Sequence, residues 1–235
     1  MTQQILSEIE PTDVAIAPLG LRAILTVPEN AVGMVIFAHG SGSGRLSPRN
    51  NYVASALRKD GFATLLLDLL TPEEEMDRAN IFDIGKLASR LSMSARWVRN
   101  HLAFSTIPIG YFGASTGAGA ALVAAARDEP EVSAIVSRGG RPDLAGQWLG
   151  KVRAPTLLIV GSLDGQVIGL NKQAFDAIVA PKRMAIVKGA GHLFEEPGTL
   201  EEVIVHASAW FSAHLDPQHE RSRNGPDNNA FSGPA

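Results

Sequence analysis

A serine flanked by glycines is the first feature of this sequence that could do chemistry. Gly113-Ala114-Ser115-Thr116-Gly117 is a G-x-S-x-G pattern, placed between the apolar run 107–112 and a segment rich in alanine. A sharp turn from strand to helix holds such a serine in a strained conformation and exposes its hydroxyl. The two flanking glycines are expected to crowd each other there, so neither could carry a side chain. We predict Ser115 as a nucleophile; the alternative is a glycine-rich turn with a bystander serine.

One histidine stands where a base would be needed. A serine hydroxyl is a poor nucleophile until a base removes its proton. Of the six histidines, His192 alone follows the last apolar run, within the loop Gly189-Ala190-Gly191-His192. That loop is expected to open at the same edge of a sheet as Ser115. We predict His192 as the base; the alternative is an inert loop histidine.

A carboxylate should hold that base in its correct tautomer and stabilise its protonated form. The apolar run 156–160 is followed by Gly161-Ser162-Leu163-Asp164-Gly165, so Asp164 leaves a predicted strand toward the same edge. The alternative is a simple turn, in which Asp-Gly pairs are common. We predict that Asp164 completes a triad with Ser115 and His192, which would transfer an acyl group through a covalent ester.

Backbone N–H groups should stabilise the oxyanion that forms during acyl transfer. The first predicted donor is Thr116, the residue after the nucleophile, and the second should come from the loop after the apolar run 34–38. That loop is His39-Gly40-Ser41-Gly42-Ser43-Gly44. The N–H of Ser41 is the candidate for the second donor, with Gly42 as the alternative.

The elements that must position these residues alternate between two patterns. Short apolar runs flanked by glycine or proline indicate buried strands, and stripes of apolar residues at spacings of three and four indicate helices. This alternation predicts an α/β fold with a mostly parallel, twisted sheet of about seven to eight strands and helices on both faces. An antiparallel strand over 21–27 is expected at the N-terminal edge. The predicted strands are 34–38, 63–67, 107–112, 132–136, 156–160 and 184–187.

Helix signals and loop lengths complete the expected domain. An apolar stripe runs over 84–102, and Thr71, Pro72 and Glu74 form a helix start signal. Thr199 and Glu202 read as a capping box ahead of a last helix, 203–215. The segment 137–154 has room for one helix and little more, so no large cap is expected. Residues 1–215 are predicted to form one domain and 216–235 a polar flexible tail.

Composition excludes several classes of protein. The chain has 235 residues, 45% of them hydrophobic and 19% charged, which is ordinary for a globular domain. The absence of cysteine excludes a thiolate nucleophile, a zinc–thiolate site, an iron–sulfur cluster and disulfides. Basic residues are scattered, the net charge is −3, and no apolar stretch approaches ~20 residues. We therefore expect no nucleic-acid partner, no membrane span and no leader segment, and a cytoplasmic monomer or homodimer that needs neither metal nor cofactor.

The chain order of Ser115, Asp164 and His192 resembles that of the α/β-hydrolase superfamily. The small size and the loop from His39 to Gly44 look most like its dienelactone hydrolase-related branch, over about 21 to 215. The resemblance implies a small ester or lactone as substrate. Dienelactone hydrolases proper use a cysteine nucleophile; the serine at position 115 favours general carboxylic ester hydrolysis.

Six further residues are candidates for substrate contacts. Arginines after strand ends could hold an acidic group of the substrate. The alternative is that they pair with Asp143, Asp68 or the run 73–75 as solvated surface charges. Apolar side chains near the predicted triad could form pocket walls, or could simply pack in the core. The candidates are Arg45, Arg138, Arg141, Trp148, Leu163 and Leu193.

Three other functions compete with ester hydrolysis. A thioesterase or acyltransferase would use the same triad, and a non-catalytic binding module could keep the same fold. A nucleotide-binding oxidoreductase is suggested by Gly40-x-Gly42-x-Gly44 after a strand, with Asp68 at the end of the next strand. That fingerprint departs from the expected spacing, because Arg45 follows its third glycine and the next helix begins only near 47–50.

Overall fold

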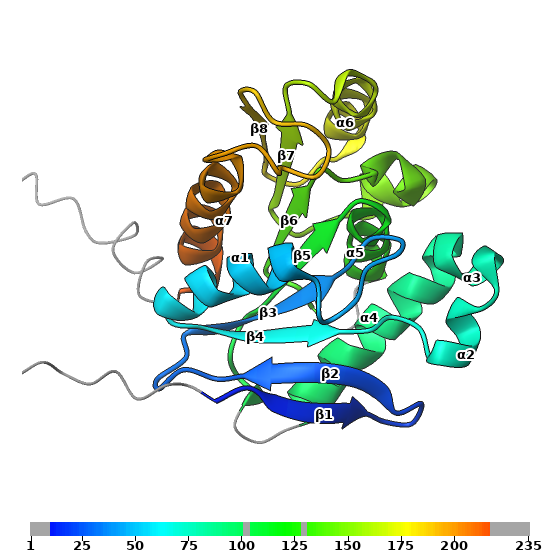
Figure 1. Cartoon of the computed structure of the whole chain (residues 1–235), viewed down its shortest axis with the longest axis vertical. Helices are drawn as coiled ribbons and strands as arrows, with labels where there is room; N and C mark the ends of the chain where they lie inside the picture. Colours follow the sequence, from blue (N-terminus) through cyan, green and yellow to red (C-terminus); the bar gives the residue numbers. More distant parts are fainter. Residues whose placement is uncertain (1–9, 101–103, 128–130, 217–235) are drawn as a thin grey trace, which may run out of the picture.

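A single eight-stranded sheet organises the molecule. The computed structural model describes residues 10–100, 104–127 and 131–216. The strands lie in the order β1-β2-β4-β3-β5-β6-β7-β8 (Figure 1). Those from β3 to β8 run parallel, whereas β2 is antiparallel to β4 and β1 is antiparallel to β2. The predicted mostly parallel sheet is confirmed, and its parallel strands end at one common edge.

The central strands are short, apolar and buried along their whole length. Helices cover both faces of a parallel sheet, so its strands have no polar side to present to water. Within β3, β4, β5, β6 and β7 every residue is buried. The strands are β1 Thr12–Ile16, β2 Leu21–Thr26, β3 Gly33–Ala38, β4 Phe62–Leu67, β5 Ile109–Ala114, β6 Ala134–Arg138, β7 Thr156–Gly161 and β8 Lys182–Val187.

Helices form a layer on each side of the sheet. Helices α1 and α7 pack on one face around Val53, Leu57 and Phe211. On the other face α4, α5 and α6 enclose a second core with Leu91 and Leu122 (Figure 1). The helices are α1 Pro48–Lys59, α2 Pro72–Glu75, α3 Arg78–Phe82, α4 Ile84–Arg99, α5 Thr116–Ala126, the 3₁₀ segment η2 Pro142–Lys151, α6 Gly165–Ala177 and α7 Thr199–Leu215.

Several predicted strand positions need correction. The strand predicted at 132–136 lies two residues later, as β6, and β8 begins at Lys182 rather than at 184. The predicted strand 21–27 is antiparallel but is not the sheet edge, because β1 pairs along its outer side. Most of β1 is exposed, so it lacks the apolar run that reveals a buried strand. The predicted strand 107–112 begins two residues later, at Ile109, since Pro108 has no N–H to contribute to the ladder.

The two predicted helix starts have different outcomes. Thr71 and Glu74 form a capping box, with each side chain accepting from the other residue's backbone N–H. The capping box predicted at Thr199 is wrong: α7 begins after Gly198, whose φ of 81° makes it a left-handed N-cap. The Thr199 hydroxyl instead donates to the carbonyl of Glu196 at 2.7 Å.

The segment after β6 is too short to build a cap. It contains only η2, and a large helical cap is absent there, as predicted. Helix α7 ends at Leu215, where the predicted domain ends. The predicted tail lies, from residue 217 onward, outside the described residues.

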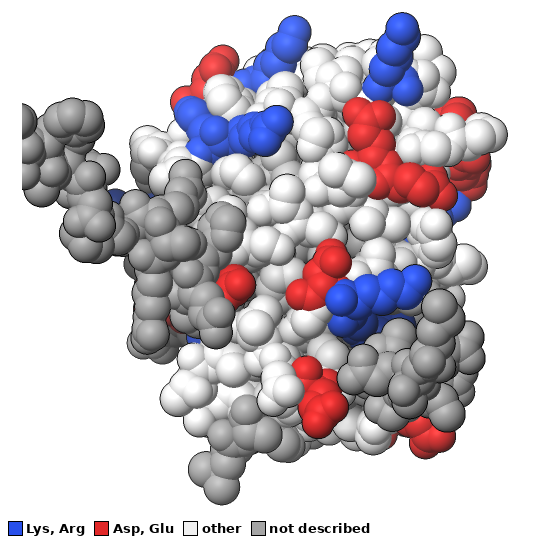
Figure 2. Space-filling view, turned by 90° about the vertical axis from the view of Figure 1, so that its left-hand side faces the viewer, with Lys and Arg blue, Asp and Glu red and all other residues white. Residues whose placement is uncertain are grey.

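One face of the molecule carries charges of both signs. In Figure 2 lysine and arginine side chains lie among aspartates and glutamates, with uncharged surface between them. Among the described residues, no helix combines the length and apolar character needed to cross a bilayer.

Candidate active site

Ser115 sits on a strained turn between β5 and α5. Its backbone has φ 50° and ψ −122°, a conformation that L-residues rarely adopt. Strain of this kind persists only where the surrounding structure fixes it, and it is frequent at functional sites. The turn leaves Ser115 partly exposed between the buried residues Ala114 and Thr116.

Backbone crowding explains the glycines on either side of this serine. A Cβ atom at Gly113 would lie 2.5 Å from Ala118 Cα and 2.8 Å from the carbonyl oxygen of Gly117. At Gly117 a Cβ would lie 2.1 Å from the carbonyl oxygen of Ala38. The prediction that the two glycines crowd each other therefore holds only for Gly113, since Gly117 is constrained by the end of β3.

Asp164 and His192 form the best-defined polar contact at this edge of the sheet. His192 Nδ1 lies 2.7 Å from Asp164 Oδ2, where an N–H on Nδ1 donates to the carboxylate. The side chain of Asp164 is 15% exposed and that of His192 is 37% exposed. The contact leaves Nε2 as the ring nitrogen available to accept a proton.

The loops that carry these two residues are joined by hydrogen bonds. Leu163 N–H donates to Ala190 O at 2.9 Å, and Gly189 N–H donates to Ser162 Oγ at 2.8 Å. These bonds cross between the end of β7 and the end of β8. They hold the loop of Asp164 against the loop of His192.

Ser115 and His192 line the same cleft of about 520 Å³. No hydrogen bond joins their side chains in this structure. Catalytic hydrogen bonds are often long in a free enzyme and tighten when substrate binds. The cleft is also lined by the loop 40–44, by Arg138 and by Leu193.

His39 fastens the start of the loop after β3. Its Nδ1–H donates to Gly40 O at 2.9 Å, and its Nε2 accepts from Leu69 N–H at 3.0 Å. Only the neutral ring can donate to Gly40 O and accept from Leu69 N–H at the same time. Burial lowers the pKa of His39 below its ordinary value, more strongly than the hydrogen bond to Gly40 and the charges of Asp68 and Glu75 raise it.

The predicted oxyanion donors adjoin the nucleophile. Gly40 is so close to Ser115 that a Cβ on it would lie 2.9 Å from Ser115 Cβ. Ser41 and Gly42, the next residues, line the cleft that holds Ser115. Thr116 opens α5, where the first N–H groups of a helix have no partner within the helix.

A second cavity of about 320 Å³ also borders this loop. It shares residues 40–43 with the cleft of Ser115 and is also lined by His39 and Thr116. Its remaining wall is mostly apolar and comes from the segment after β4 and from α4. Those residues are Leu70, Glu75, Ile81 and Leu87.

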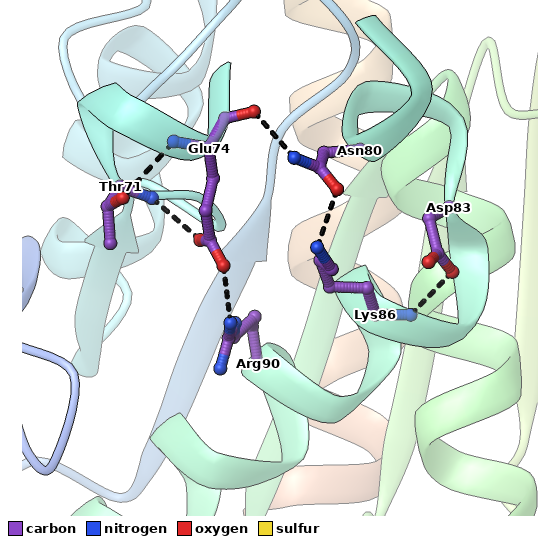
Figure 3. A network of polar contacts seen from close by, with 6 residues as sticks. All are labelled: Thr71, Glu74, Asn80, Asp83, Lys86 and Arg90. Atoms are coloured by element: carbon purple, nitrogen blue, oxygen red, sulfur yellow. Dashed lines mark hydrogen bonds and ion pairs between the residues drawn. The ribbon is translucent and has the colours of Figure 1, made fainter. Parts of the chain in front are cut away.

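A polar network holds the short helices α2 and α3 in place beside this cavity (Figure 3). Glu74 lies at its centre: its carboxylate accepts from Thr71 N–H at 3.0 Å and from Arg90 at 2.6 Å. Its backbone carbonyl accepts from the Asn80 side chain at 2.8 Å. The network consists of Thr71, Glu74, Asn80, Asp83, Lys86 and Arg90.

Of the six predicted substrate contacts, only Arg138 and Leu193 line the cleft of Ser115. Arg45 forms an ion pair with Asp68. Arg141 donates to both carboxylate oxygens of Asp143, at 2.9 and 2.8 Å.

The two remaining apolar candidates also lie away from the cleft. Trp148 packs against the core, with Arg127 and Lys151 over its ring. Leu163 is 69% exposed, beside Asp164.

Sequence reasoning missed the second cavity. Its apolar wall comes from three separate elements, and only the start signal at Thr71 marked that region. The motif Gly40-x-Gly42-x-Gly44 does not lead directly into a helix, since α1 begins at Pro48 with Ser47 as its N-cap. In residues 10–100, 104–127 and 131–216 no group of three or more His, Asp or Glu side chains could hold a metal ion.

Comparisons with known proteins identify close relatives. No protein-family model matches the chain. It is 57% identical over 206 residues to a Mycobacterium tuberculosis protein that bears the provisional name phosphoribosyl transferase. The match covers 88% of this chain and 46% of the relative, so the chain spans about half the length of the curated relatives it matches.

Two solved structures show how far the similarity of fold extends. The crystal structure of dienelactone hydrolase from Anabaena variabilis is 51% identical, with a TM-score of 0.84, and the match covers 88% of this chain and 98% of that one. Est1E from Butyrivibrio proteoclasticus is 15% identical, with a TM-score of 0.69, over 86% of this chain and 97% of its own. At that identity the likeness to Est1E concerns the fold alone.

Proposed function

This chain belongs to the dienelactone hydrolase-related branch of the α/β-hydrolase superfamily, and on that premise we propose that it is a serine hydrolase of small carboxylic esters. The observation that carries the proposal is that Ser115 and His192 line one cleft, while Asp164 contacts Nδ1 of the His192 imidazole. A hydroxyl, an imidazole and a carboxylate in this order are the components of serine-based acyl transfer.

In the proposed mechanism His192 Nε2 removes the proton of Ser115 as Oγ attacks the ester carbonyl. The backbone N–H groups of Thr116 and Ser41 stabilise the oxyanion. Collapse of the tetrahedral intermediate breaks the bond to the leaving oxygen, which takes the proton from His192, and the acyl group stays on Ser115. Water, deprotonated by His192, then attacks the acyl carbon. The bond from that carbon to Ser115 Oγ breaks, Oγ takes the proton back from His192, and the acid is released.

The serine nucleophile makes general esters candidate substrates beside the lactones in the name of the Anabaena relative. A serine is activated mainly by its base, so general esters as well as lactones are within its reach. Thioester cleavage and acyl transfer to another acceptor use the same three residues. A panel of esters, lactones and thioesters with matched acyl groups will rank these substrates by kcat/KM.

The transferase name of the mycobacterial relative applies to a protein about twice as long. The residues gathered at the sheet edge of this chain suit acyl rather than phosphoribosyl transfer. We therefore do not extend that activity to this chain. Release of pyrophosphate from phosphoribosyl pyrophosphate, retained in the Ser115→Ala variant, would contradict this assignment.

Labelling with a fluorophosphonate probe tests the proposal directly. Wild-type protein should react at one site and lose esterase activity in parallel, whereas Ser115→Ala should not react. Ser43→Ala is a matched control, because Ser43 lines the same cleft without standing on the strained turn. Labelling that persists in Ser115→Ala, or wild-type protein that neither reacts nor hydrolyses any ester, would refute the proposal.

A further inference from the structure

One buried arginine in the cleft has almost no partner. Arg138 ends β6, is 7% exposed and lines the cleft beside Ser115 and His192. Its Nε and Nη1 form no hydrogen bond with any described residue. Its Nη2 donates to Asn50 Oδ1 at a long 3.4 Å. Most of the hydrogen-bonding capacity of this guanidinium is therefore unused, although the side chain is almost fully buried.

No carboxylate compensates the charge of this arginine. The charge that acts on it is another cation, Arg49, which pairs with Glu195 at 2.7 Å. The ring of Phe194 lies 5.9 Å from the Arg138 guanidinium. Burial, and then the charge of Arg49, lower the pKa of Arg138 to about 10, so the group still carries its charge at neutral pH.

Arg138 is held on the His192 side of the cleft. The next residue, Gly139, packs so closely that a Cβ on it would lie 2.7 Å from the backbone oxygen of His192. Phe194, which flanks the guanidinium, belongs to the same loop as His192. The base and the unpaired cation thus share one wall.

The two cavities beside the oxyanion loop differ in character. The cleft of Ser115 contains the base and two cations, Arg138 and the Glu195-paired Arg49. The second cavity has the apolar residues Leu70, Ile81 and Leu87 and one carboxylate, Glu75, and neither arginine nor lysine lines it. In ester hydrolysis the leaving oxygen must lie next to the base that protonates it. The alcohol part of an ester therefore belongs in the cleft with His192, and the second cavity remains for the acyl part.

We propose that Arg138 binds an anionic group on the alcohol part of the ester, while the second cavity accepts a short uncharged acyl group. This inference rests on the proposed ester hydrolysis and specifies its substrate class. Carboxylate and phosphate both offer the paired oxygens that a guanidinium recognises. The substrate is an acyl ester of a hydroxy acid or of a phosphorylated alcohol.

Three esters with one acyl group and one aromatic ring test the inference. The butyrate ester of 4-hydroxybenzoate carries a carboxylate, 4-butyryloxyphenyl phosphate carries a phosphate, and methyl 4-butyryloxybenzoate is uncharged. Wild-type protein should show a kcat/KM at least tenfold higher for one or both anionic esters than for the uncharged one. The faster anionic ester identifies the preferred anion.

Variants assign that preference to Arg138. Arg138→Gln should reduce the ratio of anionic to neutral kcat/KM at least tenfold, mainly through KM, and Arg138→Lys should restore part of it. Arg141→Gln is the matched control, since Arg141 pairs with Asp143 and does not line the cleft. That variant should keep the wild-type ratio. Melting temperatures of all variants check folding, and Arg138→Lys carries the test if Arg138→Gln does not fold.

The outcomes separate this inference from the function on which it rests. Wild-type protein that hydrolyses the neutral ester and labels at Ser115, yet has no preference for either anion, overturns only the role of Arg138. An unchanged ratio of anionic to neutral kcat/KM in Arg138→Gln would also overturn the role of Arg138. A stronger preference for the half-ester of p-nitrophenol with succinate than for p-nitrophenyl butyrate would place the anion on the acyl side and also overturn it. Loss of all labelling and hydrolysis would instead reject the serine hydrolase.

Discussion

The carboxylate of Asp68 binds Arg45 twice, accepting from its backbone N–H at 2.7 Å and from its guanidinium. Asp68 follows β4, and Arg45 ends the glycine-rich loop that follows β3. Together with the bond from Leu69 N–H to His39, this contact ties both ends of that loop to the neighbouring strand. The loop carries the proposed oxyanion donor Ser41, so its anchoring bears on catalysis as well as on stability.

Replacement of Asp68 by alanine should lower both stability and turnover. The variant leaves the buried N–H and guanidinium of Arg45 unpaired, which should reduce the free energy of unfolding by about 1–3 kcal/mol. A loosened loop should lower kcat by about tenfold, less than the ~10²-fold expected for loss of an oxyanion donor. Urea denaturation and ester hydrolysis measure the two effects.

Asp143→Ala is the control for this substitution. It removes the partner of Arg141 from a more exposed pair, which should change stability by no more than about 1 kcal/mol. It should leave kcat unchanged. If Asp68→Ala and Asp143→Ala changed stability and kcat equally, the contact between Asp68 and Arg45 would have no special role in anchoring the loop.

His39 should make the protein less stable in mild acid. Its pKa is lowered by burial in the folded state, relative to an ordinary value of 6.5 in the unfolded chain. As the pH falls through 6.5 the unfolded chain binds a proton that the folded chain does not, so the free energy of unfolding decreases. Protonation of Nε2 would also break the bond from Leu69.

Chemical denaturation from pH 8 to pH 5 measures this effect. His39→Gln should be less stable than wild type at pH 8 but should lose less stability between pH 8 and pH 5. The two proteins differ only at residue 39, so the difference between the two curves isolates His39. Parallel curves would mean that residue 39 contributes nothing to the acid sensitivity.

The sequence predicted the parts of the site that depend on short segments. Ser115, Asp164 and His192 each follow an apolar run, and the carboxyl ends of parallel strands meet at one edge, so local patterns sufficed to bring them together. Likewise the capping box of Thr71 and Glu74 depends on residues three apart.

Features that depend on distant contacts could not be predicted. The sequence offers Asp68 and Asp143 as partners for the arginines, and Arg45 and Arg141 do pair with them. It does not indicate that Arg138 stays without a carboxylate, because that depends on which distant residues pack around it. The edge strand β1 was missed because it is largely exposed and has no continuous apolar run. Thr199 and Glu202 match the capping-box pattern, but the helix begins after Gly198, which is the N-cap in a left-handed conformation.

Gly117→Ala should damage the nucleophile turn more than an ordinary glycine substitution. The added methyl group would lie 2.1 Å from the carbonyl oxygen of Ala38, so the backbone must move. Overpacking of this kind destabilises by roughly 1–3 kcal/mol, and displacement of Ser115 should lower kcat/KM at least tenfold.

Gly169→Ala is the matched control, since Gly169 lies inside α6 with nothing within 4 Å of the added atom. Removal of a glycine from a helix interior should stabilise the protein by about 0.5–1 kcal/mol. The melting temperature should therefore fall for Gly117→Ala and rise for Gly169→Ala. A Gly117→Ala variant with wild-type stability and activity would mean that the turn relaxes without displacing Ser115.

Asp164→Asn should abolish most of the activity while leaving the fold intact. The amide keeps the size of the carboxylate, but it can donate to His192 Nδ1 and so stabilise the wrong tautomer of the ring. Loss of about 10⁴-fold in kcat is expected, with KM changed far less. Steady-state hydrolysis of the uncharged butyrate ester measures it, and circular dichroism checks the fold. The side chain of Asp176, on the same helix α6, offers a control, because Asp176→Asn should leave kcat unchanged. A decrease of less than tenfold in Asp164→Asn would mean that the 2.7 Å contact with His192 orients no catalytic base.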